Sequence, residues 1–333
     1  MRADVIRALA RECGFELAGV APALPAEPDY SAFLEWVAAG HAGRMGYLTD
    51  HRSQIRSHPG QLLPSARSIV CVGRLYNSPE PGAIARYARE EDYHQTMRRD
   101  LELLASKMQC EFGSFDYRVC VDTAPLLERS YARLAGLGWI GRNTCVINQQ
   151  FGSYVFLGEI LTSLDIDPGT PAPDRCGTCS RCIDACPTAA IVPGPLRTQI
   201  DSNRCISYLT IELKGDIPED LRSGIGTNVF GCDICQEVCP WNSRAPVAGN
   251  AISPELEQLA ELTPEQFRER FRNTPLWRTK YSGLLRNVAV AAGNSGDTRL
   301  RPVLEKLAEH EDPLIRSHAE HALAQLTLDA PEV

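Results

Sequence analysis

The feature that most constrains this 333-residue chain is a block of eight cysteines between residues 176 and 239. Its first half reads Cys-Gly-Thr-Cys-Ser-Arg-Cys-Ile-Asp-Ala-Cys-Pro from Cys176, and its second half reads Cys-Asp-Ile-Cys-Gln-Glu-Val-Cys-Pro from Cys232. Cys205 lies between the two halves. The chain has 13 cysteines, an odd number, and its first residues lack the apolar stretch of a secretory signal. The pattern therefore argues against a disulfide framework and predicts thiolate metal ligands in a reducing compartment.

The spacing of these cysteines predicts two [4Fe–4S] clusters, because C-x2-C-x2-C-x3-C-P is the run found in cubane ferredoxins. Three thiolates on a tight loop hold one cube, and the fourth points away to a second cube. We expect the first cluster to be held by Cys176, Cys179, Cys182 and Cys239. We expect the second to be held by Cys186, Cys205, Cys232 and Cys235. A pair of zinc sites is the alternative, since C-x2-C pairs also build zinc ribbons.

The whole chain divides into three predicted parts. Residues 1–165 alternate between helical and strand patterns and are predicted to form an α/β domain. A Pro-rich linker leads into residues 166–248, a ferredoxin-like domain with two clusters. Residues 249–333 carry three helical stripes of apolar residues, which predict a short HEAT-like α-helical repeat that packs on the rest of the protein.

Individual elements follow from the same patterns. Strands are expected over residues 15–20, 68–76, 117–121 and 151–162. Apolar residues spaced by three and four predict a helix from Tyr93 to Phe112, and Pro125 is expected to open another. Near the C-terminus, Asp312 and Pro313 are typical of an N-cap followed by the first residue of a helix.

The charge pattern bears on possible partners. The net charge is −8, which excludes a generic polycation, and no run of about 18 apolar residues could span a membrane. Residues 268–301, however, carry eight basic and two acidic side chains. This stretch is either a solvated helical face or a phosphate-binding surface on which Trp277 and Tyr281 stack against a splayed base.

Asp122 is the candidate catalytic residue of the first domain, because it follows a predicted strand at the point where a helix begins. The alternative is that Asp122 only caps the helix opened by Pro125. Downstream, the glycines of residues 136–141 follow a helix and so do not indicate a nicotinamide fold. They indicate either close approach to a ligand or a tight turn around a packed Trp139.

Several motifs together resemble the epoxyqueuosine reductases. These are Asp-Thr-Ala-Pro from Asp122, Gly-Leu-Gly-Trp-Ile-Gly-Arg-Asn-Thr from Gly136, Gly-Ser-Tyr-Val-Phe-Leu-Gly-Glu-Ile from Gly152, Arg-Cys-Ile-Ser-Tyr-Leu-Thr-Ile-Glu from Arg204, and the double-cluster pattern. The resemblance implies a cobalamin-dependent oxidoreductase that reduces the epoxide of epoxyqueuosine to queuosine at the wobble position of a tRNA. Base-off cobalamin would bind between the α/β and cluster domains, and a flavodoxin or ferredoxin would supply single electrons.

The resemblance also implies roles for particular residues. Asp122 matches the proton donor, and protonation of an alkoxide near neutral pH requires its pKa to be raised by burial beside the corrin. The expected cobalamin contacts, besides Asp122 itself, are Arg56, Val146, Leu157, Ser207 and Asp233. In some members a cysteine precedes the Asp-Tyr-His segment, whereas this chain has Ala85 there. His94, a lone helical histidine, is interpreted as a surface or packing residue rather than a cobalt ligand.

Two other functions remain open at this stage. One is a different corrinoid and iron–sulfur reductase, similar to the reductive dehalogenases. The other is an electron-transfer subunit with clusters but no cobalt, in which Asp122 is a dispensable cap. In each case the sequence predicts a cytoplasmic protein without a membrane segment, and we expect a monomer.

Overall fold

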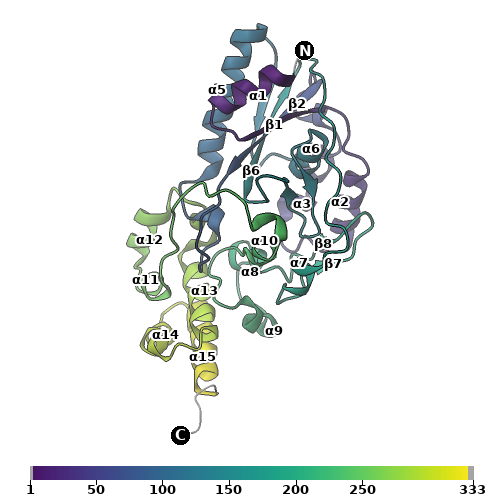
Figure 1. The fold of residues 1–333 in the computed structure, drawn as a ribbon. Helices are drawn as coiled ribbons and strands as arrows, with labels where there is room; N and C mark the ends of the chain where they lie inside the picture. Colours follow the sequence, from purple (N-terminus) through teal and green to yellow (C-terminus); the bar gives the residue numbers. More distant parts are fainter. Residues whose placement is uncertain (1–2, 329–333) are drawn as a thin grey trace.

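A four-stranded sheet organises the N-terminal part of the computed structural model, which describes residues 3–328 (Figure 1). The strands lie in the order β1 (Leu17–Pro22), β2 (Ser68–Leu75), β6 (Val155–Thr162) and β3 (Tyr117–Cys120). All four predicted strands are present, within a few residues of their expected bounds. Every neighbouring pair is antiparallel. The predicted mixture of helices and strands is therefore correct, but the sheet is not the parallel sheet of a doubly wound α/β domain.

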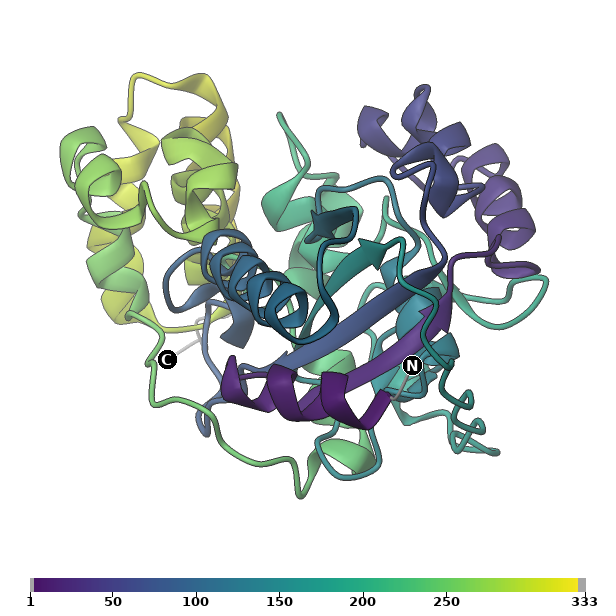
Figure 2. The ribbon, with the colours of Figure 1, turned by 90° about the horizontal axis from the view of Figure 1, so that it is seen from above.

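Helices cover both faces of this sheet. On one face, α1 (Ala3–Glu12) and α5 (Tyr93–Phe112) pack on alternate residues of β2 and β6, side by side in Figure 2. The α5 helix has the bounds that its apolar spacing predicts, and four of its apolar residues are fully buried: Met97, Leu101, Leu104 and Met108. On the other face, α6 (Glu128–Leu134) packs with a separate apolar cluster.

Short elements join the sheet to the cysteine block. After β1 come α2 (Asp29–Ala38), α3 (Gly46–Thr49) and α4 (Arg52–Ile55). The cysteine block contains α7 (Arg181–Asp184), β7 (Ile191–Val192), β8 (Gln199–Ile200), α8 (Ile206–Ile211), α9 (Glu219–Arg222) and α10 (Ile234–Glu237). The two regions touch directly, since the Trp36 indole donates to the carbonyl of Ile200 at 2.6 Å. The phenol oxygen of Tyr208 likewise accepts from the Arg44 amide at 2.8 Å.

A hairpin and several 3₁₀ turns lie between the longer elements of the chain. The hairpin is formed by β4 (Trp139–Ile140) and β5 (Val146–Ile147). The 3₁₀ turns are η1 (Pro59–Gln61), η2 (Arg86–Ala88), η3 (Ser223–Ile225), η4 (Pro240–Asn242), η5 (Pro275–Thr279) and η6 (Thr298–Leu300). Trp139 is 2% exposed and packs edge-on against Trp241. A Cβ on Gly138 would lie 2.2 Å from the carbonyl oxygen of Ile147. The glycine-rich segment thus forms a tight turn around a packed indole.

The C-terminal part is helical, as expected. It comprises α11 (Leu256–Ala260), α12 (Pro264–Phe271), α13 (Lys280–Asn294), α14 (Arg301–Ala308) and α15 (Pro313–Leu328). The Leu314 amide donates to the Asp312 carboxylate at 2.9 Å, which is the predicted cap of α15. Among residues 3–328, no helix is both long and apolar enough to span a bilayer.

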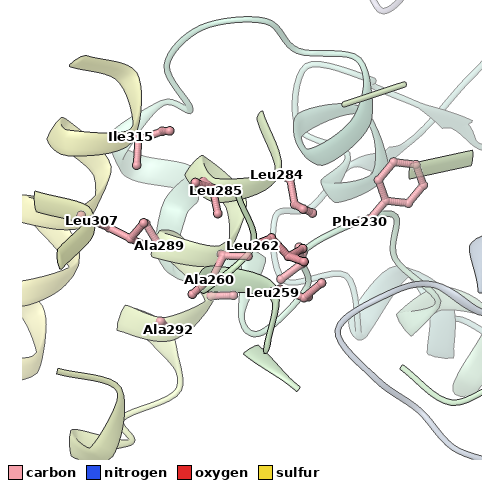
Figure 3. Close-up of a cluster of buried hydrophobic side chains, with 14 of the residues drawn as sticks. Phe230, Leu259, Ala260, Leu262, Leu284, Leu285, Ala289, Ala292, Leu307 and Ile315 are labelled. Atoms are coloured by element: carbon pink, nitrogen blue, oxygen red, sulfur yellow. The ribbon is translucent and has the colours of Figure 1, made fainter. Parts of the chain in front are cut away.

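The core of these helices crosses the predicted domain boundaries. It joins Leu284 and Leu285 of α13 to Phe230 from the cysteine block (Figure 3). Ile84 and Ala88, which follow β2, belong to the same cluster. Ile84 also forms a parallel bridge with Phe230. The two predicted domain boundaries stay predictions, and the parts on either side of them share an apolar core.

Candidate functional site

The eight cysteines of the block lie in two neighbourhoods. Cys182 is within electrostatic range of Cys176, Cys179 and Cys239, and Cys232 is within range of Cys186 and Cys205. These neighbourhoods agree with the two predicted ligand sets, and Cys235 is within range of Cys205 and Cys232 as well as of Cys182 from the other set. The assignment of each thiol to a cluster stays a prediction. Among the described residues no three metal-binding side chains converge on a single ion; ligands of a cube, by contrast, are spread over four irons.

Burial sets the protonation state of these thiols. It raises the pKa of Cys182 to about 11 and the pKa of Cys232 to about 12, and neighbouring cysteines add to both shifts. At neutral pH such groups are thiols unless a cation stabilises the thiolate. The donor set therefore suits a positively charged iron core, whose binding releases the protons.

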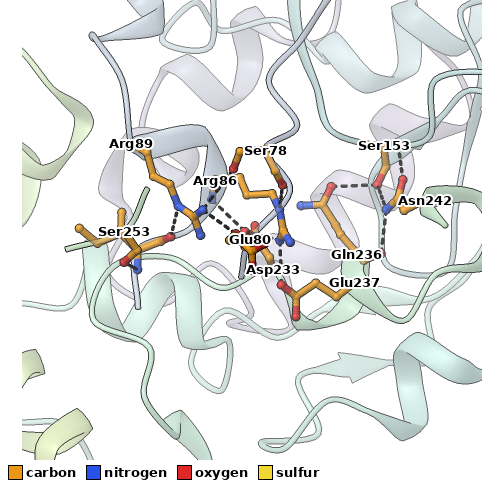
Figure 4. Close-up of polar contacts among 11 residues, drawn as sticks. Ser78, Glu80, Arg86, Arg89, Ser153, Asp233, Gln236, Glu237, Asn242 and Ser253 are labelled. Atoms are coloured by element: carbon orange, nitrogen blue, oxygen red, sulfur yellow. Dashed lines mark hydrogen bonds and ion pairs between the residues drawn. The ribbon is translucent and has the colours of Figure 1, made fainter. Parts of the chain in front are cut away.

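Polar contacts fix the second cysteine loop against the N-terminal part (Figure 4). Arg86 of η2 donates from its backbone to Asp233 at 2.8 Å and from its side chain to Asp233 at 3.2 Å and Glu237 at 2.7 Å. Nearby, the Asn242 side chain accepts from the Ser153 amide at 2.7 Å and donates to the Ser153 hydroxyl at 2.9 Å. The cysteines on either side of α10 are thus fixed relative to the sheet.

Asp122 and His94 form the acid–base pair of the site. The His94 ring lies with Nε2 3.0 Å from Asp122 Oδ2 and Nδ1 2.6 Å from Asp92 Oδ1. Burial lowers the pKa of His94, but hydrogen bonds to Asp122 and Asp92 outweigh this and raise it above the ordinary value. Because both ring nitrogens face carboxylates, one proton is shared between His94 and Asp122.

This arrangement corrects the expected pKa of Asp122. Burial works to raise that pKa, but the hydrogen bond and charge of His94, with Arg278 and Arg129, lower it below its usual value. Asp122 alone is therefore not a raised-pKa acid. The titration belongs to the pair. His94, interpreted above as a surface or packing residue, hydrogen-bonds both Asp122 and Asp92.

The backbone of Asp122 shows that this residue is not a helix cap. The α6 helix begins at Glu128, not at Pro125 as predicted, and its N-cap Leu127 makes no side-chain cap. Asp122 has φ 48°, a left-handed conformation that costs a non-glycine residue about 1 kcal/mol or more. Its amide donates to the Glu128 carboxyl, which helps to hold the turn.

A second charged group faces Asp122 from the helical part. Arg278 of η5 contacts Glu212 at 2.6 Å and lies with its guanidinium 5.6 Å from the ring centroid of Tyr47. Its charge acts on Asp122. Three regions distant in sequence, those of α3, α8 and η5, therefore meet opposite the acid–base pair.

Three of the predicted cobalamin contacts lie on the α6 side of the sheet. Val146 on β5 and Leu157 on β6 belong to one apolar cluster, which also includes Ile55 beside Arg56. Arg56 is 6% exposed. It donates to the carbonyls of Tyr47 and Arg52, and it pairs with no carboxylate in the described part of the chain. A buried guanidinium of this kind suits an anionic ligand group such as a phosphate.

The other two predicted contacts lie beside the cysteines. Ser207 hydrogen-bonds the thiol of Cys205. Asp233 is 6% exposed, and its Oδ1 has no hydrogen-bond partner among the described residues. Burial raises the pKa of Tyr87, and the charges of both Asp122 and Asp233 raise it further.

The predicted phosphate-binding stretch is only partly exposed. Arg286 is 1% exposed and donates to the carbonyls of Leu209, Leu213 and Gly215. Arg278 faces the site, while Trp277 and Tyr281 pack against Phe267. The stretch is therefore not one continuous surface, and its binding of phosphate stays a prediction. Its exposed cations are Arg268, Arg270, Arg272, Arg278, Lys280 and Arg299.

Two functional candidates were not identified from sequence. His94 becomes significant only through Asp122, 28 residues away, and Glu128 only through the Asp122 amide and the sheet behind it. The one available signal for His94 was Asp92 two residues before it, which also caps α5 by accepting from the His94 amide at 3.0 Å.

Comparison with known proteins first identifies the class of protein to which this chain belongs. Residues 175–242 match the family model of the 4Fe-4S double cluster binding domain. With its paired cysteine runs, the chain is therefore a double-cluster iron–sulfur protein.

The particular family follows from longer matches. Residues 56–123 match the family model of epoxyqueuosine reductase (QueG). The chain is 42% identical to the epoxyqueuosine reductase of Xanthomonas campestris over 96% of this chain and 95% of the relative. This chain belongs to the epoxyqueuosine reductase family.

Two solved structures support the relation. One is an epoxyqueuosine reductase with an epoxyqueuosine-modified tRNA-Tyr stem loop, with TM-score 0.85, 28% identity and coverage of 97% of this chain and 89% of that chain. The other, from Bacillus subtilis, has its catalytic aspartate loop swung out of the active site. It gives TM-score 0.85, 28% identity and coverage of 97% and 90%.

Proposed function

We propose that this chain reduces the epoxide of epoxyqueuosine, at the wobble position of a tRNA, to the alkene of queuosine. The reaction takes two electrons and two protons and releases one water. The observation that carries the proposal is the proton-sharing pair of Asp122 and His94 beside a two-cluster domain. The relation to tRNA-modifying reductases supports the choice of substrate.

The cysteine block would deliver the electrons. We assign one [4Fe–4S] cluster to Cys176, Cys179, Cys182 and Cys239, and the other to Cys186, Cys205, Cys232 and Cys235. A flavodoxin or ferredoxin is the proposed donor, because both pass single electrons, which two adjacent cubes store and relay. Zinc would provide structure but no electron path.

The residues of the site fit a base-off cobalamin. Buried Arg56 suits the phosphate of its nucleotide tail, the orphaned Asp233 Oδ1 suits an amide of its side chains, and Val146 and Leu157 offer apolar contact. Ser207 completes the set. When bound, cobalamin supplies a strongly reducing metal centre that can act on the epoxide carbon.

The side chains of the site supply a proton to the reaction. Opening the strained ring places negative charge on the epoxide oxygen, and the proton held between His94 Nε2 and Asp122 Oδ2 is positioned to neutralise it. A second proton is needed before that oxygen leaves as water. Arg278, facing Asp122, favours the carboxylate form that remains after proton transfer.

The same proposal covers the tRNA and the setting. The HEAT-like helices α11–α15 would carry the tRNA backbone on their outer cations, with the modified base directed to Asp122. We place the activity in the cytoplasm, with the protein as a monomer. The aspartate loop of the Bacillus subtilis relative occurs outside its active site; we propose that the Asp122 loop of this chain moves in the same way.

The decisive experiment uses anaerobically purified protein loaded with clusters and cobalamin, a chemical reductant, and tRNA bearing epoxyqueuosine. We expect the modified nucleoside to become lighter by one oxygen, only when cobalamin is present, as measured by mass spectrometry. No conversion by protein that holds intact clusters and cobalt would reject the substrate and favour a reaction of the reductive dehalogenase type. Intact clusters that never bind cobalt would favour an electron-transfer subunit.

A further inference from the structure

Behind Asp122 lies a second pair of acidic side chains that the proposed chemistry does not use. Glu128, the first residue of α6, accepts the backbone N–H of Asp122 with its carboxyl Oε1. Glu159, near the middle of β6, is 0% exposed. Neither carboxyl oxygen of Glu159 has a hydrogen-bond partner among the described residues. The Glu128 carboxyl lies near enough for the two acids to act on each other's protonation.

The surroundings of Glu159 require it to stay protonated. Its cross-strand neighbours are Cys71 on β2 and Cys120 on β3, both 0% exposed, so no cation approaches from the sheet. An ionised carboxylate without a donor or a counter-charge is strongly disfavoured. Burial and the facing Glu128 accordingly raise the pKa of Glu159 well above its ordinary value. The Glu159 O–H can then donate to Glu128, which still accepts from Asp122.

We propose that Glu128 is a positioning residue that holds the loop of the proton donor Asp122 in the site, and that Glu159 fixes Glu128 from the sheet behind it. The inference rests on the proposed function only in taking Asp122 as the donor. The loop needs such an anchor, because the left-handed Asp122 backbone relaxes to an ordinary conformation unless its neighbours hold it. Relaxation would carry the Asp122 carboxyl away from His94.

Turnover distinguishes anchoring from a general packing role. We expect Glu128→Met, which keeps the length of the side chain but removes its oxygens, to lower kcat by roughly 10- to 100-fold, because a displaced catalytic group is costly. The KM for tRNA should stay unchanged, since Glu128 lies behind the Asp122 loop. Glu128→Gln should restore most of the turnover, because its amide oxygen accepts from the Asp122 N–H. Equal losses in the Met and Gln variants would overturn the proposal.

Glu159 is tested by the same logic. Glu159→Gln imitates a protonated acid, so it should retain most of the turnover, whereas Glu159→Ala should reduce kcat as Glu128→Met does. A Gln variant as damaged as the Ala variant would show that Glu159 works as a charged group, against the proposal. Glu111→Ala, an exposed glutamate on α5, is the matched control.

Amide hydrogen exchange gives a readout independent of activity. In cluster-loaded protein without tRNA, Glu128→Met should speed exchange at the Asp122 amide, while Glu128→Gln and Glu111→Ala should not. If Glu128→Met lowers turnover without changing this exchange, the anchoring role is wrong while Asp122 keeps its role. If exchange responds as expected but wild-type protein reduces no epoxide, the anchoring stands and the proposed function fails. Should the Met variant not fold, Glu159→Ala carries the exchange test: it should speed exchange at the Asp122 amide, and unchanged exchange in Glu159→Ala would contradict the proposal.

Discussion

Asp122 and His94 share one proton because each nitrogen of the His94 ring faces a carboxylate. In this geometry the acid is the pair: removing Asp122 removes the acceptor of the proton on His94 Nε2, and removing His94 removes the main group that lowers the pKa of Asp122. The α6 helix begins six residues after Asp122, at Glu128, so replacing Asp122 costs no helix cap. The effect of an Asp122 substitution on catalysis can therefore be measured without a large effect on stability.

Replacing Asp122 tests the proton donor. We expect Asp122→Asn to lower kcat by roughly 10²- to 10⁴-fold, the range of general acid catalysis, while cobalamin stays bound. Turnover on tRNA and the visible absorbance of the cofactor measure the two properties. Asp220→Asn, on the exposed side of α9, is the control. Turnover close to wild type in Asp122→Asn would remove Asp122 from the chemistry.

The pH profile tests the shared proton. Asp122 and Asp92 raise the pKa of His94, so the protonated pair persists below that raised pKa and is lost as pH rises through it. Arg278 and Arg129 face the same pair and favour the Asp122 carboxylate. Activity should therefore fall on the alkaline side. Asp92→Asn keeps the cap of α5 but removes a charge, so the falling limb should move to lower pH. An unmoved limb in single-turnover assays would contradict this assignment.

At the residue scale, the sequence alone predicts those site residues that are recognised by short spacings along the chain. Seven of the eight cysteines could be recognised because their separations of three and four residues are imposed by the cluster itself, and Cys205 was added because it lies between the two runs. His94, Glu128 and the burial of Arg286 could not, because each depends on partners brought by folding from other segments. The pKa of Asp122 was predicted in the wrong direction because its dominant partner, His94, was not known.

At the scale of elements, two asparagines hold the loop between α10 and α11 beside the sheet: Asn242, and Asn77, whose side chain donates to the carbonyls of Ala245 and Pro246. Asn242 bonds the Ser153 amide, the Ser153 hydroxyl and the Gln236 carbonyl. Gly152 has to be a glycine here, since it has φ 69° and its Cβ would lie 2.2 Å from Asn242 Oδ1. Cys239, a proposed cluster ligand, lies only three residues before Asn242.

Removing Asn242 should loosen this loop. We expect Asn242→Ala to lower the free energy of unfolding by about 1–3 kcal/mol, because it leaves buried polar groups without partners. The clusters should also be lost faster to an iron chelator, followed by their visible absorbance. Asn250→Ala, at an exposed position, should match wild type in both measurements. Unchanged cluster loss in Asn242→Ala would show that the loop is held by other contacts.

Helices and strands are predicted well where their apolar residues repeat at one regular spacing. The α5 helix was predicted residue for residue because its buried stripe is regular and Asp92 caps it. The start of α6 was misplaced because Pro125 is compatible with a turn as well as with a first helical residue. The antiparallel order β1-β2-β6-β3 has no local signal, since strand direction depends on the path of the long connections.

At the scale of the whole molecule, the exposed cations of the helical part are the proposed surface for tRNA. We expect the combined change of Arg268, Arg270 and Arg272 to alanine to weaken tRNA binding. The salt dependence of binding should also become less steep, by about one counterion for each phosphate that the variant no longer neutralises. Equilibrium binding at several salt concentrations measures both effects.

A control at the far end of the chain makes this test specific. Arg7→Ala combined with Arg11→Ala removes two cations of the α1 helix, and tRNA affinity should be unchanged. Equal weakening by both sets of substitutions would indicate a diffuse charge effect rather than a tRNA surface on α12. Arg286 is unsuitable for this purpose, since its guanidinium satisfies three backbone carbonyls in the core.

The core shared by Ile84 and the helix α13 has a consequence for how the protein is made. The ribosome releases Ile84 roughly two hundred residues before Leu285, a delay of about 10–40 s at ordinary elongation rates. During that interval the apolar segment after β2 lacks the helix that covers it in the finished protein. The nascent chain therefore exposes an apolar segment for a long time. The shared core can form only after the last third of the polypeptide has left the exit tunnel.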